Sequence, residues 1–438
     1  MEKFEIDSND DEEKLEYKQS KKKKSKQKKK QKNKFFLPII IISIVTILLF
    51  ILIIFIQKIF NKNRKNFTPQ EYYNVLVGDI GGIHSRIRLL NMTSNISIAP
   101  IVVQELNDTT TSYKTLEELI TKFLSSIDKE HKPDFAFIGL PGPIEDNCII
   151  TLPNIPQWES YNGTELGIKL GFKKLIFIND FVGDGYAIQT NLVEKKDYIV
   201  LNKVQPKKNG AKLMIGPGTG LGMGFLLKDE NEKNGYYTIG SSEGGGRDYA
   251  PKTKFDFKLR NFIKNETGLE NISLETICSA RALIFIYKFL HITENDNDDY
   301  NSKVKREPKL AKKIDGFHNY REMNKINEIN SELIKKGLSG ECQLSKRTLL
   351  VFIEIYGEIA GDLALFTLAS NGVYLLGRLT RELTPLILDN TIFMNHFKNK
   401  DHFWFLLERI PVYLIQNENI ELIGITEAAR RFFEENEN

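Results

Sequence analysis

The chain has 438 residues, 41% of them hydrophobic and 11% aromatic, which suffices for large buried cores and favours two or three domains. Its net charge of +4 arises largely from a lysine-rich run, residues 21–34, which lacks the interleaved aromatic residues typical of nucleic-acid-binding patches. Because that run adjoins an apolar segment, it indicates the flank of a membrane anchor and predicts no nucleic-acid partner. Cys148, Cys278 and Cys342 form no CxxC or Cys/His spacing and predict buried thiols, not a disulfide framework or a zinc site.

Three segments precede the globular region. Residues 1–34 are polar and charged, which predicts a disordered Lys-rich tail. Residues 35–56 form an uncharged run of Ile, Leu and Phe that would extend about 33 Å as a helix, enough to cross a bilayer. The run is too long and too far from the N-terminus for a typical cleaved signal peptide, and too apolar for an ordinary core helix. We therefore expect a single transmembrane helix, followed by a linker over residues 57–71.

The orientation of this predicted single-pass membrane protein stays open. The excess of lysines before the apolar run places the N-terminus in the cytoplasm by the positive-inside rule. The globular region would then face a lumen or the exterior, where ATP is scarce. Asn-x-Ser/Thr sequons fit that orientation weakly, since an Asn-rich chain contains several by chance. They begin at Asn66, Asn91, Asn95, Asn107, Asn162, Asn265 and Asn271.

From Tyr72 onward the pattern is that of an α/β protein. Short apolar runs, each followed by Gly, Pro, Asn or Asp, predict buried strands over 75–77, 134–138, 175–178, 212–215 and 372–376. Helical patterns lie between them, for example over 116–127 and 348–368. The polar stretch 293–337 predicts an exposed loop with a helix. This alternation indicates a mostly parallel or mixed sheet with helices on both faces.

Two glycine-rich loops, residues 79–86 and 216–222, bracket the pair Asn179-Asp180. Glycine lets the backbone approach phosphate oxygens closely and offer its N–H groups to them. Asp180 follows the apolar run 175–178, which would deliver its carboxylate to deprotonate a hydroxyl that attacks a phosphate. The order of these segments therefore indicates a small-molecule kinase.

Each segment also has a plainer interpretation. Asp79 could hold a magnesium ion that bridges nucleotide phosphates, or could serve with Gly81 and Gly82 only as a hairpin turn. Asp180 could be a general base or the N-cap of a helix over 182–188. Glu243 precedes three glycines and suits sugar hydroxyls, or belongs to a surface turn.

Taken together, these segments resemble the bacterial-type glucokinases of the hexokinase/actin-like ATPase superfamily. The resemblance runs from about Tyr72 to Phe433, some four fifths of the chain, and leaves the first 65 residues without a counterpart. Its landmarks are 76–82, Asn154 with Trp158, 178–181, 216–222, 243–245 with 248–251, Leu274 and Glu275 with Ser279, and 410–415.

The resemblance implies ATP-dependent phosphorylation of the 6-hydroxyl of glucose with Mg²⁺ as the metal. Asp180 would be the catalytic base, and Asn179, Glu243 and Glu275 would bind the sugar. ATP phosphates and metal would be held by Asp79, Gly81, Gly82, Gly218, Thr219 and Gly220, with Asp79 as the metal ligand and Gly377 in the adenosine loop.

The fold implied by the resemblance is the two-domain actin-like ATPase (ribonuclease H-like) fold with a central cleft, here preceded by the transmembrane helix. Residues 72–189 would form a small α/β domain completed by 418–438, and residues 190–417 a large α/β domain. Closure of the cleft over the sugar would exclude water. A homodimer is a further option.

Several positions depart from the family pattern. Ile83 and His84 stand where the family has Thr and Asn, which weakens the first phosphate loop, and Gly246 replaces a sugar-binding His. A Gly-Gly pair of the adenosine loop is Gly377-Arg378 here, and a Ser-Gly-Pro-Gly turn has become residues 279–282. Each lost contact is worth about 1–3 kcal/mol.

Three hypotheses follow. The first is a membrane-anchored, ATP-dependent hexose kinase that acts on glucose. The second is a catalytically impaired, membrane-tethered protein that binds sugar or nucleotide, as a pseudokinase or sensor. The third, a repressor of the related sugar-kinase family with a DNA-binding arm, is disfavoured because the cysteine-rich zinc motif of that family is absent from the sequence.

Overall fold

The structure is a computed structural model that describes residues 48–49, 51–52, 54–55, 71–152, 155, 157–190, 193–229, 235–296, 307–317, 319, 322–389 and 391–437. The chain divides into two units, residues 1–71 and 72–438. The predicted tail, 1–34, and the predicted linker, apart from Glu71, lie outside the described residues.

The prediction of a transmembrane helix, and with it of a single-pass membrane localisation, is corrected by the structure. Across the described ranges, no helix combines the length and the apolar character needed to cross a bilayer. Most of the run 35–56 lies outside the described residues.

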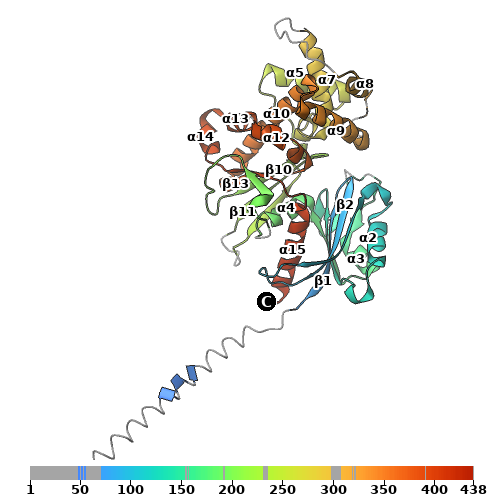
Figure 1. Cartoon of the computed structure of the whole chain (residues 1–438), viewed down its shortest axis with the longest axis vertical. Coiled ribbons are helices and arrows are strands. Elements are labelled where there is room, and N and C mark those ends of the chain that lie inside the picture. Colours follow the sequence, from blue (N-terminus) through green and yellow to red (C-terminus); the bar gives the residue numbers. More distant parts are fainter. Residues whose placement is uncertain are drawn as a thin grey trace, which may run out of the picture. The chain divides into compact units, whose positions relative to one another are not determined.

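The second unit contains all the strands and most of the helices that the structure describes (Figure 1). The strands are β1 (Tyr73–Ile80), β2 (His84–Met92), β3 (Ile101–Thr109), β4 (Phe135–Leu140), β5 (Ile144–Glu145), β6 (Cys148–Ile149), β7 (Tyr161–Asn162), β8 (Lys174–Asn179), β9 (Tyr198–Val200), β10 (Lys212–Pro217), β11 (Leu221–Lys228), β12 (Tyr237–Ser242), β13 (Gly372–Leu375) and β14 (Val412–Ile415). The helices are α2 (Leu116–Ser125), α3 (Gly163–Leu170), α4 (Asp180–Ala187), α5 (Lys254–Thr267), α6 (Leu274–Ile277), α7 (Ala280–Asp296), α8 (Pro308–Asp315), α9 (Met323–Ser339), α10 (Gln343–Thr367), α11 (Arg378–Glu382), α12 (Thr384–Asp389), α13 (Ile392–Lys398), α14 (Trp404–Leu407) and α15 (Ile420–Glu437).

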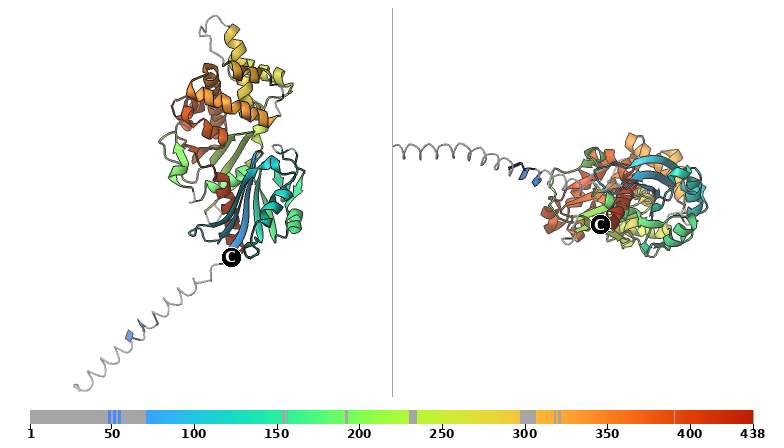
Figure 2. Two further views of the ribbon diagram at one scale, coloured as in Figure 1. Left: turned by 45° about the vertical axis from the view of Figure 1, so that its right-hand side comes forward. Right: turned by 90° about the horizontal axis from the view of Figure 1, so that it is seen from below.

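The first sheet has the order β3-β2-β1-β4-β8, with β1, β4 and β8 parallel and β2 and β3 antiparallel to their neighbours. Side chains alternate between its faces, as the pleat of a strand requires. Leu76 and Ile80 of β1 pack with α2 and α3, whereas Val75 and Val77 pack with α15 on the other face. Asp79 therefore belongs to the face that α15 covers, and Figure 2 shows this helix along the strands.

The second sheet has the order β12-β11-β10-β13-β14-β9, in which β10, β13 and β14 are parallel and the remaining pairs antiparallel. Leu213 and Ile215 of β10 point into a large core shared with α5, α7, α8, α9, α10 and α13. Met214, between them, packs on the opposite face with Ala187 of α4. A small third sheet, β5-β6-β7, lies beside the first.

The predicted strands and helices are present with small shifts of their ends. The stretch 293–337 differs from the predicted exposed loop with one helix, because α8 and α9 both lie in it and bury Leu310, Ile314, Ile326 and Leu333 in the large core. Its polar residues cover the outer faces of amphipathic helices. Among the cysteines, Cys278 and Cys342 are buried as expected and Cys148 is half-buried.

The predicted domain boundaries stay a prediction. The strands of the first sheet fall within 72–189 and those of the second within 190–417, and α15 falls within 418–438.

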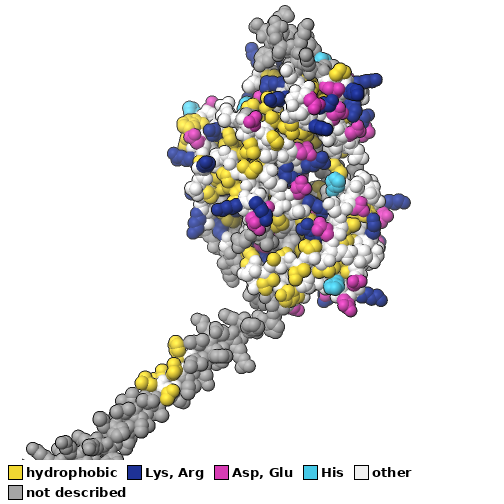
Figure 3. Space-filling view, in the orientation of Figure 1, with side chains coloured by type: hydrophobic (Ala, Val, Ile, Leu, Met, Phe, Trp, Pro, Cys, Tyr) yellow, Lys and Arg dark blue, Asp and Glu magenta, His cyan; other side chains and the backbone are white. Residues whose placement is uncertain are grey.

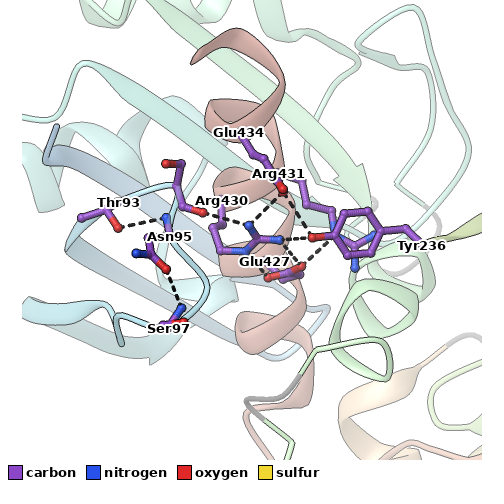
Figure 4. A network of polar contacts seen from close by, with 9 residues as sticks. Thr93, Asn95, Ser97, Tyr236, Glu427, Arg430, Arg431 and Glu434 are labelled. Atoms are coloured by element: carbon purple, nitrogen blue, oxygen red, sulfur yellow. Dashed lines mark hydrogen bonds and ion pairs between the residues drawn. The ribbon is translucent and has the colours of Figure 1, made fainter. Parts of the chain in front are cut away.

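A buried ionic cluster on α15 joins three parts of the second unit (Figure 4). Glu427 is fully buried and accepts hydrogen bonds from Arg430 Nε at 2.7 Å, Arg430 Nη2 at 2.8 Å and Arg431 Nε at 2.7 Å. Arg430 also donates to Ser94 O after β2 (2.9 Å) and to the hydroxyl of Tyr236 before β12 (2.8 Å). The guanidinium of Arg431 lies 3.5 Å from the centre of the Tyr236 ring. The cluster thus connects α15 to both large sheets.

Candidate active site

A cavity of about 450 Å³ lies between the two large sheets and is lined from both of them. All of the predicted site residues except Asp79 line it. From the first sheet and α4 these are Gly81, Gly82, Asn179 and Asp180, and from the second sheet and its helices Gly218, Thr219, Gly220, Glu243, Glu275 and Gly377. Residues that are almost 300 positions apart in the sequence are therefore gathered around one space. On the face of the molecule shown in Figure 3, acidic and basic side chains lie interspersed.

Asp180 is the first residue of α4, directly after β8. The N-cap of this helix is Asn179, whose Oδ1 accepts a hydrogen bond from the backbone N–H of Val182 at 3.2 Å. The alternative prediction, in which Asp180 is the N-cap, is therefore wrong, because the preceding residue has that role. Asn179 Nδ2 donates to Gly142 O at 3.0 Å. With capping done by its neighbour, the Asp180 carboxylate is available for chemistry and accepts one hydrogen bond, from the Phe181 N–H at 2.9 Å.

The pKa of Asp180 is raised to about 7, mainly because burial disfavours its charged form and further because Asp79 and Glu243 add negative charge nearby. A general base works best with a pKa near the operating pH, since it is then both unprotonated and basic enough to accept a proton. The electrostatics of the cavity therefore suit Asp180 to proton abstraction.

Two further carboxyl groups, Asp184 and Glu421, line the cavity and were not predicted. Burial raises the pKa of each well above its ordinary value, and the negative charges of Asp79 and Asp180 add to the effect. Asp184 is one helical turn after Asp180, so the spacing i, i+4 could have indicated it. Glu421 lies on α15, near the C-terminal end of the sequence, and no local sequence pattern indicates that it lines the cavity.

Asp79 is buried beneath the cavity wall and forms an ion pair with Arg86 Nη2. Arg86 Nη1 in turn donates to Glu418 O at 2.6 Å and Asn419 Oδ1 at 3.1 Å, which ties the β1–β2 hairpin to the segment before α15. The hairpin-turn interpretation of residues 79–84 is geometrically correct, since β1 and β2 pair antiparallel there. Sequence reasoning missed Arg86, although it lies in the same loop motif.

Asp79 and the carboxyl groups around it are the candidate donors for Mg²⁺. Among the described residues, no group of three or more His, Cys, Asp or Glu side chains is placed to hold a metal ion. Mg²⁺ in nucleotide enzymes needs only one or two carboxylates, because waters and substrate phosphates complete its shell. Asp79, next to the glycine pair Gly81-Gly82 and with Asp180, Asp184 and Glu421 nearby, meets that requirement in the number of carboxylates.

The loop between β10 and β11 is a tight turn in which Gly218 N donates to Gly220 O at 2.8 Å. A Cβ at Gly218 would meet no atom within 4 Å, so this glycine leaves open space at the cavity surface. Gly377 packs against this loop with φ = 89°, a backbone conformation that favours glycine. A Cβ at Gly377 would also come within 2.9 Å of Pro217 O, so the position excludes any other residue.

The two predicted sugar carboxylates differ in their surroundings. Glu243 is exposed and precedes the 3₁₀ turn Gly244–Gly246. Glu275 on α6 accepts from Leu221 N at 3.1 Å and from Arg281 Nη1 at 3.0 Å. Arg378, which departs from the family pattern, lines the cavity and pairs with Glu382 at 2.7 Å.

The family model described as Glucokinase matches residues 76–432. The glucokinase of Trichormus variabilis is 30% identical over 359 residues, which are 82% of this chain and 99% of that protein. Among solved structures, a glucokinase from Balamuthia mandrillaris in complex with glucose has a TM-score of 0.62 and 18% identity, over 82% of this chain and 94% of that one. A ROK family glucokinase from Streptomyces griseus in complex with glucose and AMPPNP has a TM-score of 0.50 and 14% identity, over 82% of this chain and 99% of that one. The structural likeness confirms the predicted mixed α/β class and the actin-like ATPase fold.

Proposed function

The chain belongs to the glucokinase family, and on that premise we propose that it transfers the γ-phosphoryl group of ATP to the 6-hydroxyl of glucose, with Asp180 as general base. The observation that carries the assignment of the base is the position of Asp180, at the cavity surface with a pKa raised to about 7. Its carboxylate accepts the hydroxyl proton as the hydroxyl oxygen attacks phosphorus, and the released nucleotide leaves as ADP.

The sugar is assigned to the side of the cavity that contains Asn179, Glu243 and Glu275. Carboxylate and amide oxygens accept hydrogen bonds from the several hydroxyls of a hexose. The relative from Balamuthia mandrillaris binds glucose in its crystal structure, which supports glucose as the substrate class.

The nucleotide is assigned to the glycine-rich side, where Gly81, Gly82 and the turn Gly218–Gly220 offer close backbone approach to phosphates, and Gly377 borders the adenosine. Mg²⁺, when bound, neutralises charge on the phosphates, and Asp79 would hold it. The AMPPNP in the Streptomyces griseus relative supports an adenine nucleotide as donor. Closure of two hinged domains and assembly into a homodimer stay predictions.

Two observations favour a second candidate function, a catalytically impaired protein that binds sugar or nucleotide. Asp79 is engaged by Arg86, and hydrophobic Ile83 occupies a place in the first phosphate loop where the resemblance leads us to expect a hydroxyl. Both features weaken the binding of phosphate and metal and leave the residues assigned to the sugar unchanged.

A coupled assay of glucose phosphorylation on the full chain separates the two candidates. We expect turnover that depends on ATP and Mg²⁺ and falls by at least about 100-fold in Asp180→Asn, which keeps the shape of the side chain and removes the base. Glucose binding by calorimetry is expected to be retained in this variant. Turnover of the natural chain no faster than that of Asp180→Asn would overturn the kinase assignment in favour of the impaired binder.

A further inference from the structure

Arg281 is a cavity residue to which the sequence analysis assigned no role. It is the second residue of α7 and lines the cavity together with Asp180, Glu243 and Glu275. Its side chain is 19% exposed, and Nη1 lies 3.0 Å from Glu275 Oε1. An arginine is thus in direct contact with a carboxylate of the proposed sugar site.

The Glu275 carboxylate is held on both of its oxygens. Oε1 accepts from Arg281, and Oε2 accepts from the Leu221 N–H at 3.1 Å. A Cβ at Gly220 would collide with Oε2, so the loop before β11 closes over the carboxylate from the other side. The plane of the carboxylate is therefore set by Arg281 and by the loop backbone together, since two bonds on different oxygens leave little freedom to rotate.

The backbone that carries Arg281 is itself anchored. Ala280 N donates to Gly218 O at 2.9 Å, and Asn330 Nδ2 from α9 donates to Ala280 O at 2.6 Å. The start of α7 is thus joined to the phosphate-type loop on one side and to the large core on the other. A side chain on so rigid a support can position a partner to within a fraction of an ångström, as binding sites require.

The hydrogen-bonding groups of Arg281 and Glu275 indicate which kind of ligand they bind. A carboxylate offers about four acceptor sites, of which two are used here, and a guanidinium offers five N–H donors. Arg281 Nε is buried and has no hydrogen-bond partner among the described residues. Because the Arg–Glu pair is close to neutral, it suits the hydroxyls of a neutral polyol, whereas a phosphate beside Glu275 would meet like charge.

We propose that Arg281 is a sugar-positioning residue, which orients Glu275 to accept hydrogen bonds from hydroxyls of the hexose. The inference rests on the proposed function, since it assigns Glu275 to the sugar. It adds a residue at which this chain departs from the family pattern, within the segment 279–282.

The test compares Arg281→Ala and Arg281→Lys with the full natural chain, using calorimetric titration with glucose in the absence of ATP and steady-state kinetics. For Arg281→Ala we expect the Kd and KM for glucose to rise about 10- to 100-fold, as for loss of a charged hydrogen-bond partner, with kcat within about 3-fold and the KM for ATP unchanged. Arg281→Lys should recover part of the affinity, because an ammonium keeps the charge and loses the planar fork. Arg347→Ala is the matched control, because Arg347 pairs with Glu354 (3.2 Å) on α10 and does not line the cavity.

A loss of kcat at unchanged glucose affinity would overturn the inference and point to a contact with the transferred phosphoryl group. Unchanged kinetics in both Arg281 variants would also overturn the inference. Glucose binding by the natural chain without turnover refutes only the kinase function, since the calorimetric series still decides the role of Arg281. Absence of glucose binding by the natural chain refutes the inference itself. If Arg281→Ala fails to fold, as judged by its thermal unfolding, the lysine variant alone decides the outcome.

Discussion

Replacement of Glu427 by Gln probes how strongly the ionic cluster of α15 holds the second unit together (Figure 4). Gln keeps the shape of Glu and removes the negative charge between two arginines whose side chains are 7% and 8% exposed. Three charged hydrogen bonds of 2.7–2.8 Å are altered, and two buried guanidinium groups lose their common counter-charge. Removal of one partner from a buried ion pair costs about 3–5 kcal/mol, much more than the pair contributes relative to an apolar replacement.

The assay is urea unfolding, followed by far-UV circular dichroism, with Glu105→Gln as control. Glu105 also pairs with an arginine, Arg88, at 3.1 Å, but its side chain is 40% exposed, and such surface pairs contribute about 0–1 kcal/mol. We expect the free energy of unfolding to fall by about 3–5 kcal/mol in Glu427→Gln and by less than about 1 kcal/mol in Glu105→Gln. Equal losses in the two variants would show that burial of the Glu427 cluster has no energetic consequence and would refute the reasoning.

Three further predictions concern the cavity and the last helix. Burial raises the pKa of Asp180 to about 7, so kcat/KM should rise with pH through about 7. For the same reason the free energy of unfolding should decrease as pH rises from the ordinary pKa of Asp toward 7, and Asp180→Asn should lessen that slope, to which Asp184 and Glu421 also contribute. Thermal unfolding at several pH values measures the slope, and an unchanged slope in the variant would contradict the raised pKa of Asp180. The double substitution Ile83→Thr and His84→Asn should raise kcat/KM by up to about 10- to 100-fold, since each restored contact to phosphate is worth about 1–3 kcal/mol; no gain in the coupled assay would mean that this loop does not limit turnover. Phe433→Ala should cost about 3–5 kcal/mol of unfolding free energy, because this ring is 3% exposed and stacks on Tyr73 at 3.9 Å, and a loss below about 1 kcal/mol in urea unfolding would contradict the packing described.

Local patterns in the sequence predict most of the elements that build the cavity. The apolar runs before Asp180 and before residue 216 are buried strands that place polar residues at one edge of each sheet. Such runs are visible because a strand buried on both faces needs continuous apolar residues. The glycine-rich loops are visible because close backbone approach excludes a Cβ.

Residues that act through distant contacts could not be predicted in this way. Glu421 reaches the cavity only because α15 returns to the first sheet, and Arg281 acquires its role from a contact with Glu275 that depends on the start of α7. The polar stretch 293–337 predicts an exposed loop with one helix because its apolar residues are few and widely spaced, but these residues suffice for the inner faces of α8 and α9. For the apolar run 35–56, length, apolar composition and a basic flank predict a membrane span, whereas no helix among the described residues is long and apolar enough for one.

Helix α15 contributes Leu422, Ile425 and Phe433 to the core on one face of the first sheet, whose strands β1 and β2 belong to the beginning of the second unit. During synthesis this face has no cover until α15 emerges, because the chain is made from its N-terminus. The apolar surface of β1 and β2 therefore stays exposed while the second sheet and its helices are made. Loss of α15 should then affect folding yield and aggregation in cells more than any loss within the surface loops.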